Sequence, residues 1–275
     1  MYDEIKNYKK AVENIRNHLK QYLLDNNLKA MVVGVSGGID SALTAALASK
    51  VAKDLNIPLI ARSLTIESNK PEEVQRSIMV GKAFATDFRH VDLTEAYKKV
   101  QPLIVEDFDK EDKNSYDFKI RMGNIKARLR MIYLYDLAAK NKGLVLSTDN
   151  YTELLLGFWT LHGDVGDLGM IQNLWKTEVY EIAKWIAENE ATPKQAEALW
   201  ACINAVPTDG LGITNSDLDQ LGAPSYAEVD KILKAYLNGD TSLKDHPVIK
   251  RHLVTRFKRN NPYNFPREII LKDAN

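Results

Sequence analysis

Hydrophobic and polar residues follow two different spacings in the first two thirds of the chain. Short, mostly apolar runs are typical of buried strands, and they cover residues 30–35, 58–64, 88–93 and 144–148. Longer segments with apolar residues three or four positions apart predict helices over residues 4–26, 40–55, 71–86 and 120–141. Because strands that alternate with helices favour a parallel sheet with both faces covered, we expect an α/β fold with a doubly wound, mostly parallel sheet.

The rest of the chain is less regular. The charged stretch 106–117 is expected to be a solvated loop, and the pattern after residue 176 becomes helical, with short loops rich in Gly, Pro, Asn and Asp. No internal repeat or low-complexity tract divides the 275 residues. We therefore expect one domain over residues 1–275, built from an N-terminal helix, a sheet-containing core and a helical C-terminal part at 1–26, 27–175 and 176–275.

Composition narrows the class of protein further. Hydrophobic residues make up 45% and charged residues 27% of the chain, which is ordinary for a globular protein. The 37 basic and 37 acidic residues balance, so no overall charge draws the chain to nucleic acid or to an anionic membrane. A single cysteine, Cys202, fits a reducing compartment, and neither a signal peptide nor an apolar stretch of ~18 residues is found. The expectation is a cytoplasmic protein that binds neither nucleic acid nor membrane.

The sharpest local signal is the sequence Ser-Gly-Gly-Ile-Asp-Ser, which joins the first predicted strand to the helix after it. Backbone N–H groups at a helix start are unsatisfied and carry partial positive charge, and adjacent glycines let them approach an anion closely. The pattern predicts a phosphate site formed by Gly34, Val35, Ser36, Gly37, Gly38, Ile39, Asp40 and Ser41. The carboxylate of Asp40 fits such a site if it holds a divalent cation that also contacts the phosphates. The alternative is an ordinary turn in which Asp40 is a first-turn acid.

Two other nucleotide-binding motifs are missing from the sequence. Gly81-Lys82 is followed by Ala83 rather than by the Ser or Thr of a P-loop NTPase. No G-x-G-x-x-G follows the first strand. Neither a P-loop NTPase nor a dinucleotide-binding dehydrogenase is therefore favoured.

The S-G-G-x-D-S sequence after a first strand resembles the PP-loop of the ATP pyrophosphatase superfamily. Members of this superfamily cleave ATP to AMP and pyrophosphate while they adenylate an oxygen of the substrate. They include NAD synthetase, GMP synthetase and enzymes that thiolate tRNA. The loop alone does not choose among them.

The segment Gly-Asn-Ile-Lys-Ala-Arg-Leu-Arg at 123–130 is similar to the G-N-x-x-A-R-x-R of the NAD synthetase family. Asn124 and Arg128 lie four residues apart on a predicted helix, so both side chains can face one ligand. A planar guanidinium suits a phosphate or a carboxylate, and the resemblance implies that both residues bind the substrate. The alternative is a solvated basic helix face.

A second segment, residues 147–164, closely resembles the family's G-T-x-N-x-x-E…G-x-x-T-x-x-G-D block, with Ser147 in place of the usual Gly. The resemblance implies that Thr148 borders the nucleotide and that Asp164 lies beside the incoming ammonia. It also implies that Glu153 joins Asp40 in holding Mg²⁺. As alternatives, Glu153 is a helix N-terminal acid and Asp164 a turn former.

A third segment, Pro-Thr-Asp-Gly-Leu at 207–211, is similar to the family's P-T-A-x-L, which implies that Thr208 contacts phosphate or metal. The motif continues to Tyr226-x-x-Val229-Asp230. The chain departs from the family pattern at further points: Leu218 stands where Glu is usual, the spacing to Tyr226 is one residue longer, and Phe257 stands where His is frequent.

Scattered matches extend the resemblance over most of the chain. Lys176 matches a lysine that the family places near the ATP phosphates, and Arg62 matches a position near ATP. Tyr22 matches a position near the pyridine ring of the substrate. The pair Lys258 and Arg259 matches basic residues that bind the substrate.

Together these matches imply an ammonia-dependent synthesis of NAD⁺. The carboxylate of deamido-NAD⁺ is adenylated by ATP, pyrophosphate leaves, and ammonia then displaces AMP. Two anions meet in the first step, so positive groups must offset their charge, and Lys176 is expected to act there together with Mg²⁺. Ammonia is mostly ammonium at neutral pH, so a carboxylate that binds the cation and accepts a proton aids the second step, and Asp164 is the candidate.

The resemblance also implies a homodimer with the dinucleotide near the subunit interface. Glutamine-using relatives carry a separate amidase domain with a catalytic cysteine, for which this chain has no residues to spare, and Cys202 is expected to pack as a small hydrophobe. Two alternatives remain. One is another PP-loop enzyme, GMP synthetase-like or tRNA-modifying, and the other is a catalytically silent nucleotide-binding protein.

Overall fold

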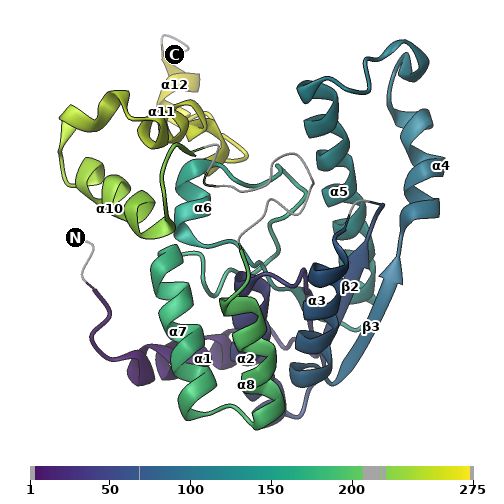
Figure 1. Ribbon diagram of the computed structural model, residues 1–275, viewed down its shortest axis with the longest axis vertical. Helices are drawn as coiled ribbons and strands as arrows, with labels where there is room; N and C mark the ends of the chain where they lie inside the picture. The colour runs from purple at the N-terminus through teal and green to yellow at the C-terminus, as the bar shows by residue number, and fades with distance from the viewer. Residues whose placement is uncertain (1–3, 68, 207–217, 219–220, 273–275) are drawn as a thin grey trace.

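A four-stranded parallel sheet is the centre of the described part of the chain (Figure 1). The computed structural model describes residues 4–67, 69–206, 218 and 221–272. The strands stand in the order β3-β2-β1-β4 and span β1 (Met31–Gly34), β2 (Leu59–Thr65), β3 (Asp87–Asp92) and β4 (Leu144–Val145). Because β1 has β2 on one side and β4 on the other, the strand order reverses next to β1. In open α/β sheets such a point, at the carboxyl ends of the strands, is where ligands bind.

Helices surround the sheet and form most of the C-terminal third. Their bounds are α1 (Tyr8–Asp25), α2 (Ile39–Leu55), α3 (Pro71–Phe84), α4 (Thr94–Ile104), α5 (Tyr116–Lys140), α6 (Tyr151–Leu156), α7 (Lys176–Asn189), α8 (Pro193–Ile203), α10 (Tyr226–Leu237), α11 (Pro247–Val254) and α12 (Arg267–Leu271). Short 3-10 turns lie at η1 (Phe108–Lys110), η2 (Thr241–Asp245) and η3 (Arg256–Arg259).

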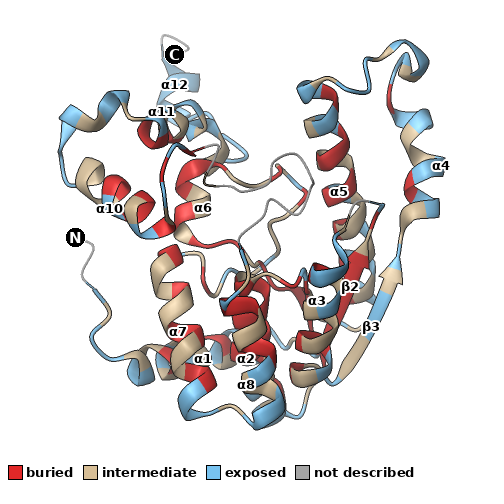
Figure 2. Cartoon of the chain, in the orientation of Figure 1, coloured by how far each residue is buried: buried red, intermediate tan, exposed pale blue. Residues whose placement is uncertain are grey.

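Alternate residues of the strands enter two different cores, as the period of a strand requires. Met31 and Val33 of β1 join the larger core with residues of α1, α2, α7 and α8. Val32 joins a smaller core on the opposite face, where Met131 and Leu134 of α5 cover the sheet. Apart from Asp40, the first ten residues of α2 are buried between the sheet and the outer helices (Figure 2), whereas Lys50, Lys53 and Asp54 near its end are exposed. The sheet is therefore covered on both faces, which explains its nearly continuous apolar strands.

A separate apolar core holds the C-terminal helices together. Leu155 and Leu156 of α6 pack there with Val229 and Leu233 of α10 and with residues of α11. In Figure 1 this group lies at the upper left, with α6 beside α10 and below α11, while α4 and the far end of α5 lie at the right. α7 contacts both α2 and α10, so it links the two cores.

The expected α/β class with a mostly parallel sheet is confirmed, and the differences from the predicted elements are local. The first helix begins at Tyr8 rather than residue 4, because the side chain of Asn7 caps it by accepting a bond from the backbone N–H of Lys10. The strand predicted over 144–148 stops at Val145, and Leu146 makes only an isolated bridge to Leu168.

The prediction of an uninterrupted loop over 106–117 was wrong, because η1 and the first residues of α5 fall within it. The helix α4 was not predicted from the sequence. No described helix has the length and apolar character needed to cross a bilayer.

Candidate active site

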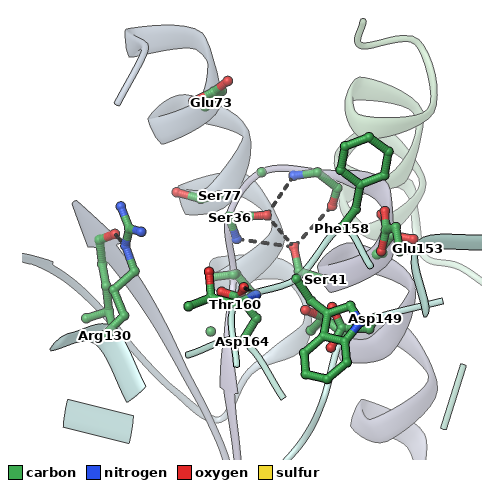
Figure 3. Close-up of a pocket in the computed structure, with 18 of the residues that line it drawn as sticks. Ser36, Ser41, Glu73, Ser77, Arg130, Asp149, Glu153, Phe158, Thr160 and Asp164 are labelled. Atoms are coloured by element: carbon green, nitrogen blue, oxygen red, sulfur yellow. Dashed lines mark hydrogen bonds between the residues drawn. The ribbon is translucent and has the colours of Figure 1, made fainter. Parts of the chain in front are cut away.

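The loop between β1 and α2 is closed on itself by its two serine side chains. Ser36 Oγ accepts from the backbone N–H of Gly38, and Ser41 Oγ donates to the carbonyl of Gly38, at 3.2 and 3.1 Å. The backbone N–H of Ser36 in turn donates to Ser41 Oγ at 3.2 Å. Figure 3 shows this ring of hydrogen bonds at the cavity wall. The loop shape is therefore set by the serines of the predicted motif, and it ends at the start of α2, where helix N–H groups favour an anion.

Gly37 must be glycine for two independent reasons. Its φ of +87° lies in the left-handed region, and a Cβ would stand 2.2 Å from the backbone oxygen of Glu73. Arg76 of α3 donates from Nε to the carbonyl of Gly37 at 2.9 Å, which holds the loop from outside. The loop is thus fixed to α3 as well as to the strand that precedes it.

Three charged side chains meet beside this loop, each from the first turn of a different helix. Lys176 Nζ of α7 donates to Asp40 Oδ2 of α2 at 2.5 Å and to Glu153 Oε1 of α6 at 2.9 Å. The lysine side chain is only 5% exposed. Asn150, fully buried, donates to Asp40 Oδ1 at 2.7 Å and caps α6 by accepting from the N–H of Glu153. The asparagine of the family motif thus ties the two predicted metal ligands together.

Burial and crowding of carboxyl groups shift the pKa values in this cluster. Burial, then the charge of Asp40, raises the pKa of Glu153 to about 7. Burial, then the charges of Glu153 and Asp164, raises the pKa of Asp149 well above its ordinary value. Burial disfavours charge on Lys176, but Asp40 and Glu153 outweigh it and raise its pKa. The carboxyl groups of this cluster outnumber its one ammonium group, that of Lys176. A further cation bound there would therefore be stabilised by the excess of negative charge.

The carboxylate oxygens of Asp40 and Glu153 are suitable ligands for a magnesium ion. Mg²⁺ prefers oxygen ligands and is often held by one or two carboxylates together with the phosphates of a substrate. Within the described residues no three His, Cys, Asp or Glu side chains form a ready-made metal cluster. A site of this kind therefore depends on the phosphates for the remaining ligands.

Asp164 lies in a loop and lines the same cavity as the phosphate loop, at its other end. Its Oδ2 accepts from the backbone N–H of Thr160 at 2.5 Å, and Thr160 Oγ1 donates to Asn124 Oδ1 at 2.8 Å. Burial raises the pKa of the Asp164 carboxyl, while the Thr160 bonds and the charges of Arg130 and Lys258 oppose that rise. Lys258 donates to the carbonyls of Gly157 and Trp159 at 2.8 and 2.6 Å and so fastens the loop that carries Asp164.

One cavity of about 580 Å³ contains both ends, and Arg130 and Glu73 line other parts of its wall (Figure 3). A volume of this size is usual for a small-molecule site. Of the predicted site residues it is lined by Gly34, Val35, Ser36, Gly37, Gly38, Ile39, Asp40, Ser41, Arg62, Asn124, Thr148, Glu153, Asp164, Lys176 and Lys258. The side chains of Val35 and Ile39 are packed in the larger core, so only their backbone is available to a ligand.

Other predicted residues lie differently. The Arg62 guanidinium is buried and pairs with Asp87 at 2.9 Å, although Arg62 borders the cavity. Arg128 and Arg259 do not line it; Arg128 donates to the carbonyl of Leu161, and Arg259 donates to that of Leu155. Tyr22 lies on α1, 39% exposed, and does not line the cavity either. Thr208 falls outside the described residues.

Many lining residues were missed at the sequence level, and several of them are charged. Arg130 is held by the carbonyl of Leu64 at 3.1 Å, and burial lowers its pKa. Arg251 stacks over the ring of Phe158 at 3.7 Å and donates to the carbonyl of Leu156. Glu73, Arg76 and Asp149 are further charged residues of the lining. Arg130 and Asp149 lie within the family motifs at 123–130 and 147–164, so these motifs could have identified them as site residues. Arg76 and Arg251 lie in no such motif, and only the folded structure shows that they line the cavity.

The chain is similar in sequence to NAD synthetases. The sequence model of the NAD synthase family matches residues 11–262. The NH₃-dependent NAD⁺ synthetase of Thermoplasma acidophilum is 33% identical over 266 residues, covering 94% of this chain and 98% of its own. The enzyme of the same name from Finegoldia magna is 35% identical over 240 residues, covering 87% of this chain and 89% of its own.

Solved structures share the fold. The NMN synthetase of Francisella tularensis superposes with a TM-score of 0.78 at 24% identity, covering 95% of this chain and 99% of its own. The NH₃-dependent NAD synthetase of Campylobacter jejuni superposes with a TM-score of 0.70 at 23% identity, covering 94% of this chain and 100% of its own. These likenesses concern the fold, and the sequence matches identify the family.

Proposed function

The chain belongs to the NAD synthase family, and on that basis we propose that it converts deamido-NAD⁺, ATP and ammonia to NAD⁺, AMP and pyrophosphate. The observation that carries the proposal is the meeting of Asp40, Glu153 and Lys176 beside the loop after β1. This arrangement puts helix N–H groups and a buried ammonium where a triphosphate has to be held. Nothing in the comparisons favours a GMP synthetase, a tRNA-modifying enzyme or a silent nucleotide-binding protein.

The first half-reaction needs the charge repulsion between two anions to be offset. The loop 34–41 binds the phosphates through its backbone, and the Lys176 ammonium faces them from α7. Asp40 and Glu153 would hold Mg²⁺, which would supply further positive charge to the phosphates when bound. The substrate carboxylate then attacks the α-phosphorus, the acyl-adenylate forms and pyrophosphate leaves.

The second half-reaction is assigned to the other end of the cavity. Asp164 binds ammonium and accepts a proton from it, so that ammonia attacks the acyl carbon and AMP leaves. Burial raises the pKa of Asp164, which makes its carboxylate a better proton acceptor. The Thr160 backbone N–H keeps one carboxylate oxygen in place during that transfer.

Free ammonia, rather than glutamine, is the proposed nitrogen source. Release of ammonia from glutamine by an amidase uses a cysteine nucleophile, and the sequence has one cysteine. Cys202 is buried in α8, and burial raises the pKa of its thiol to about 12. A thiol that stays protonated at neutral pH is a poor nucleophile.

The proposal extends to the whole chain as one domain, acting in the cytoplasm as a homodimer. Tyr22 does not line the cavity of its own chain, so the contact with the pyridine ring implied for it requires a second copy. Mixing inactive Tyr22→Ala and Lys176→Met proteins tests this, because a shared site regains activity in mixed dimers. Sedimentation that gives monomers at assay concentrations would contradict the homodimer.

A steady-state assay with matched omissions tests the activity. We expect AMP and NAD⁺ to form in equal amounts only when ATP, Mg²⁺, deamido-NAD⁺ and ammonium are all present, and highly purified glutamine to replace ammonium poorly. Xanthosine monophosphate and nicotinic acid mononucleotide serve as competing acceptors. Faster turnover with either acceptor than with deamido-NAD⁺ would overturn the assignment of the substrate.

A further inference from the structure

Asp230 is a buried carboxylate that the reaction does not use directly. It lies on α10, 2% exposed, and within the described residues its carboxylate accepts hydrogen bonds from two other helices. Its Oδ1 accepts from Thr152 Oγ1 of α6 at 2.5 Å. Its Oδ2 accepts from the backbone N–H and the hydroxyl of Thr177 of α7, at 3.0 and 2.8 Å. One carboxylate thus joins three helices.

The two threonines are the sequence neighbours of two active-site residues. Thr152 precedes Glu153 on α6, and Thr177 follows Lys176 on α7. Thr152 Oγ1 also accepts from the backbone N–H of Lys176 at 2.9 Å, so the threonine hydroxyl is shared between Asp230 and Lys176. The backbone position of Lys176 and the start of α6 are therefore set by the same carboxylate.

Asp230 also acts at the N-terminus of α7. The residue before this helix, Trp175, makes no side-chain cap, while the first N–H groups of the helix bond to Thr152 and to Asp230. A negative group at a helix start is favoured by the partial positive charge there. Tyr226, one turn before Asp230 on α10, places its ring 5.1 Å from Lys176 Nζ. One face of α10 thus contacts the Lys176 ammonium through Tyr226 and reaches the Lys176 backbone through Thr152.

Packing alone does not require a carboxylate at this position. α10 is already anchored by Val229 and Leu233, both fully buried in the C-terminal core. Burying a carboxylate has a large desolvation cost, and well-packed apolar residues often stabilise such positions equally well. The bonds of Asp230 instead align the helices that carry Glu153 and Lys176, which belong to different cores.

We propose that Asp230 is a positioning residue, which holds Lys176 and Glu153 in register for the adenylation step through Thr152 and Thr177. This inference rests on the proposed function, because the step it serves is adenylation. The C-terminal core, through α10, would therefore help to position Lys176 and Glu153 in the active site beside the sheet.

Replacing Asp230 by Asn tests the proposal with almost no change in size. The amide keeps one acceptor oxygen instead of two and removes the negative charge at the start of α7, so Asn cannot accept from Thr152 and also from both donors of Thr177. We expect the single-turnover rate of adenylation to fall about 10- to 100-fold, as is usual when an outer group that orients a site is removed. The KM for ATP should change less than about threefold, because the loop 34–41 is untouched.

Two further comparisons separate positioning from general destabilisation. Thr152→Val should lower the adenylation rate about as much as Asp230→Asn, while Thr152→Ser, which keeps the hydroxyl, should stay within about threefold of the wild type. Val229→Ala weakens the packing of α10 without touching the network, and its melting temperature provides the matched control. Equal loss of rate in Val229→Ala and Asp230→Asn, or a wild-type rate in Asp230→Asn, would overturn the proposal.

A crystal structure of Asp230→Asn provides a readout that needs no turnover. We expect Lys176 Nζ to leave the positions 2.5 Å from Asp40 and 2.9 Å from Glu153 that it occupies in the wild type. Unchanged distances contradict positioning by Asp230. Failure of the wild-type protein to form any adenylate instead rejects the proposed function, and leaves this structural comparison valid.

Discussion

The two ends of the cavity are built by different means. Beside the phosphate loop, Asp40, Glu153 and Lys176 come from the first turns of three helices and bond directly to one another. At the other end Asp164 lies in a loop, and no described cation comes within ion-pair distance of it. Its place depends on the backbone N–H of Thr160 and on Lys258, which holds the carbonyls of Gly157 and Trp159.

This difference fits the proposed division of the reaction between the two ends of the cavity. Helix starts are rigid and carry partial positive charge, so they suit a step in which phosphates must be held and charge offset. A loop carboxylate without a paired cation is free to bind one, and ammonium is the cation that the second step needs. Changes at the phosphate end should therefore stop adenylation, and changes at the Asp164 end should slow amidation alone.

Lys176→Met should have the largest effect on this division. It removes the cation shared by Asp40 and Glu153, which is the positive charge proposed to face the phosphates. We expect adenylation to slow by at least about 10²- to 10³-fold, the usual loss when one preorganised charge-stabilising group is removed. Single-turnover release of pyrophosphate measures it. Lys184→Met on the same helix is the control, because Lys184 pairs only with Glu181 near the surface; equal losses in both variants would show that the charge at Lys176 is not special.

Asp164→Asn should have the opposite effect to Lys176→Met: it should slow the amidation half-reaction and leave adenylation nearly unchanged. The amide oxygen still accepts from the Thr160 N–H, but the group no longer accepts a proton from ammonium. We expect conversion of the adenylate to NAD⁺ to slow about 10²-fold, the lower range for loss of a general base, with adenylation within about threefold of the wild type. Rapid quenching with and without ammonium resolves the two rates. Parallel losses in the two rates would remove Asp164 from the amidation step.

Gly37→Ala tests whether the backbone of the loop, and not only its charges, defines the phosphate end. The new Cβ meets the Glu73 carbonyl at 2.2 Å in a left-handed conformation. We expect a loss of about 1–3 kcal/mol in the free energy of unfolding and weaker ATP binding by calorimetry. Gly239→Ala is the matched control, since its φ is +104° with no atom within 4 Å of the new Cβ. Gly239→Ala should lower the free energy of unfolding without weakening ATP binding. Equal ATP affinity in the two variants would show that the backbone of the loop does not define the phosphate end.

The smallest predicted effect is a pH dependence of stability, measured with EDTA. Burial and Asp40 raise the pKa of Glu153 from 4.5 to about 7 in the folded protein. Between these values the folded chain holds a proton that the unfolded chain has released, so this group makes the free energy of unfolding fall as pH rises from about 4.5 to about 7. Above that range it adds no further change. Urea unfolding of Glu153→Gln should show a shallower fall than the wild type and than the exposed control Glu188→Gln, and three identical slopes would contradict the shifted pKa.

The sheet and the phosphate loop could be predicted because their signals are local. A buried parallel strand is a continuous apolar run, and the Ser-Gly-Gly-Ile-Asp-Ser turn follows it directly. The helix α4 was missed because it is short and contains Pro102, which is unfavourable inside a helix. The strand that begins at Leu144 was predicted too long. The apolar sequence continues past Val145, where the chain leaves the sheet, so the end of the strand is not visible in the composition.

Residues that depend on long-range contacts were harder to predict. Arg76 and Arg251 lie on helices where an arginine is ordinarily a surface residue, and only the packing of α3 and α11 brings them to the cavity. Arg62 matched the family but is bound to Asp87, a contact set by the pairing of β2 with β3. Asp230 stood in a quoted motif, yet its partners on α6 and α7 are visible only in the folded chain.

The order of the two half-reactions can be observed in one rapid-quench measurement on the wild-type protein. Enzyme in excess is mixed with ATP, Mg²⁺ and deamido-NAD⁺ without ammonium, and ammonium is added later. A ligase that adenylates first should release pyrophosphate and accumulate the adenylate before ammonium arrives, then form NAD⁺ and AMP together. Absence of pyrophosphate until ammonium is present would show that the phosphate end does not work on its own, and the division between the two ends would be wrong.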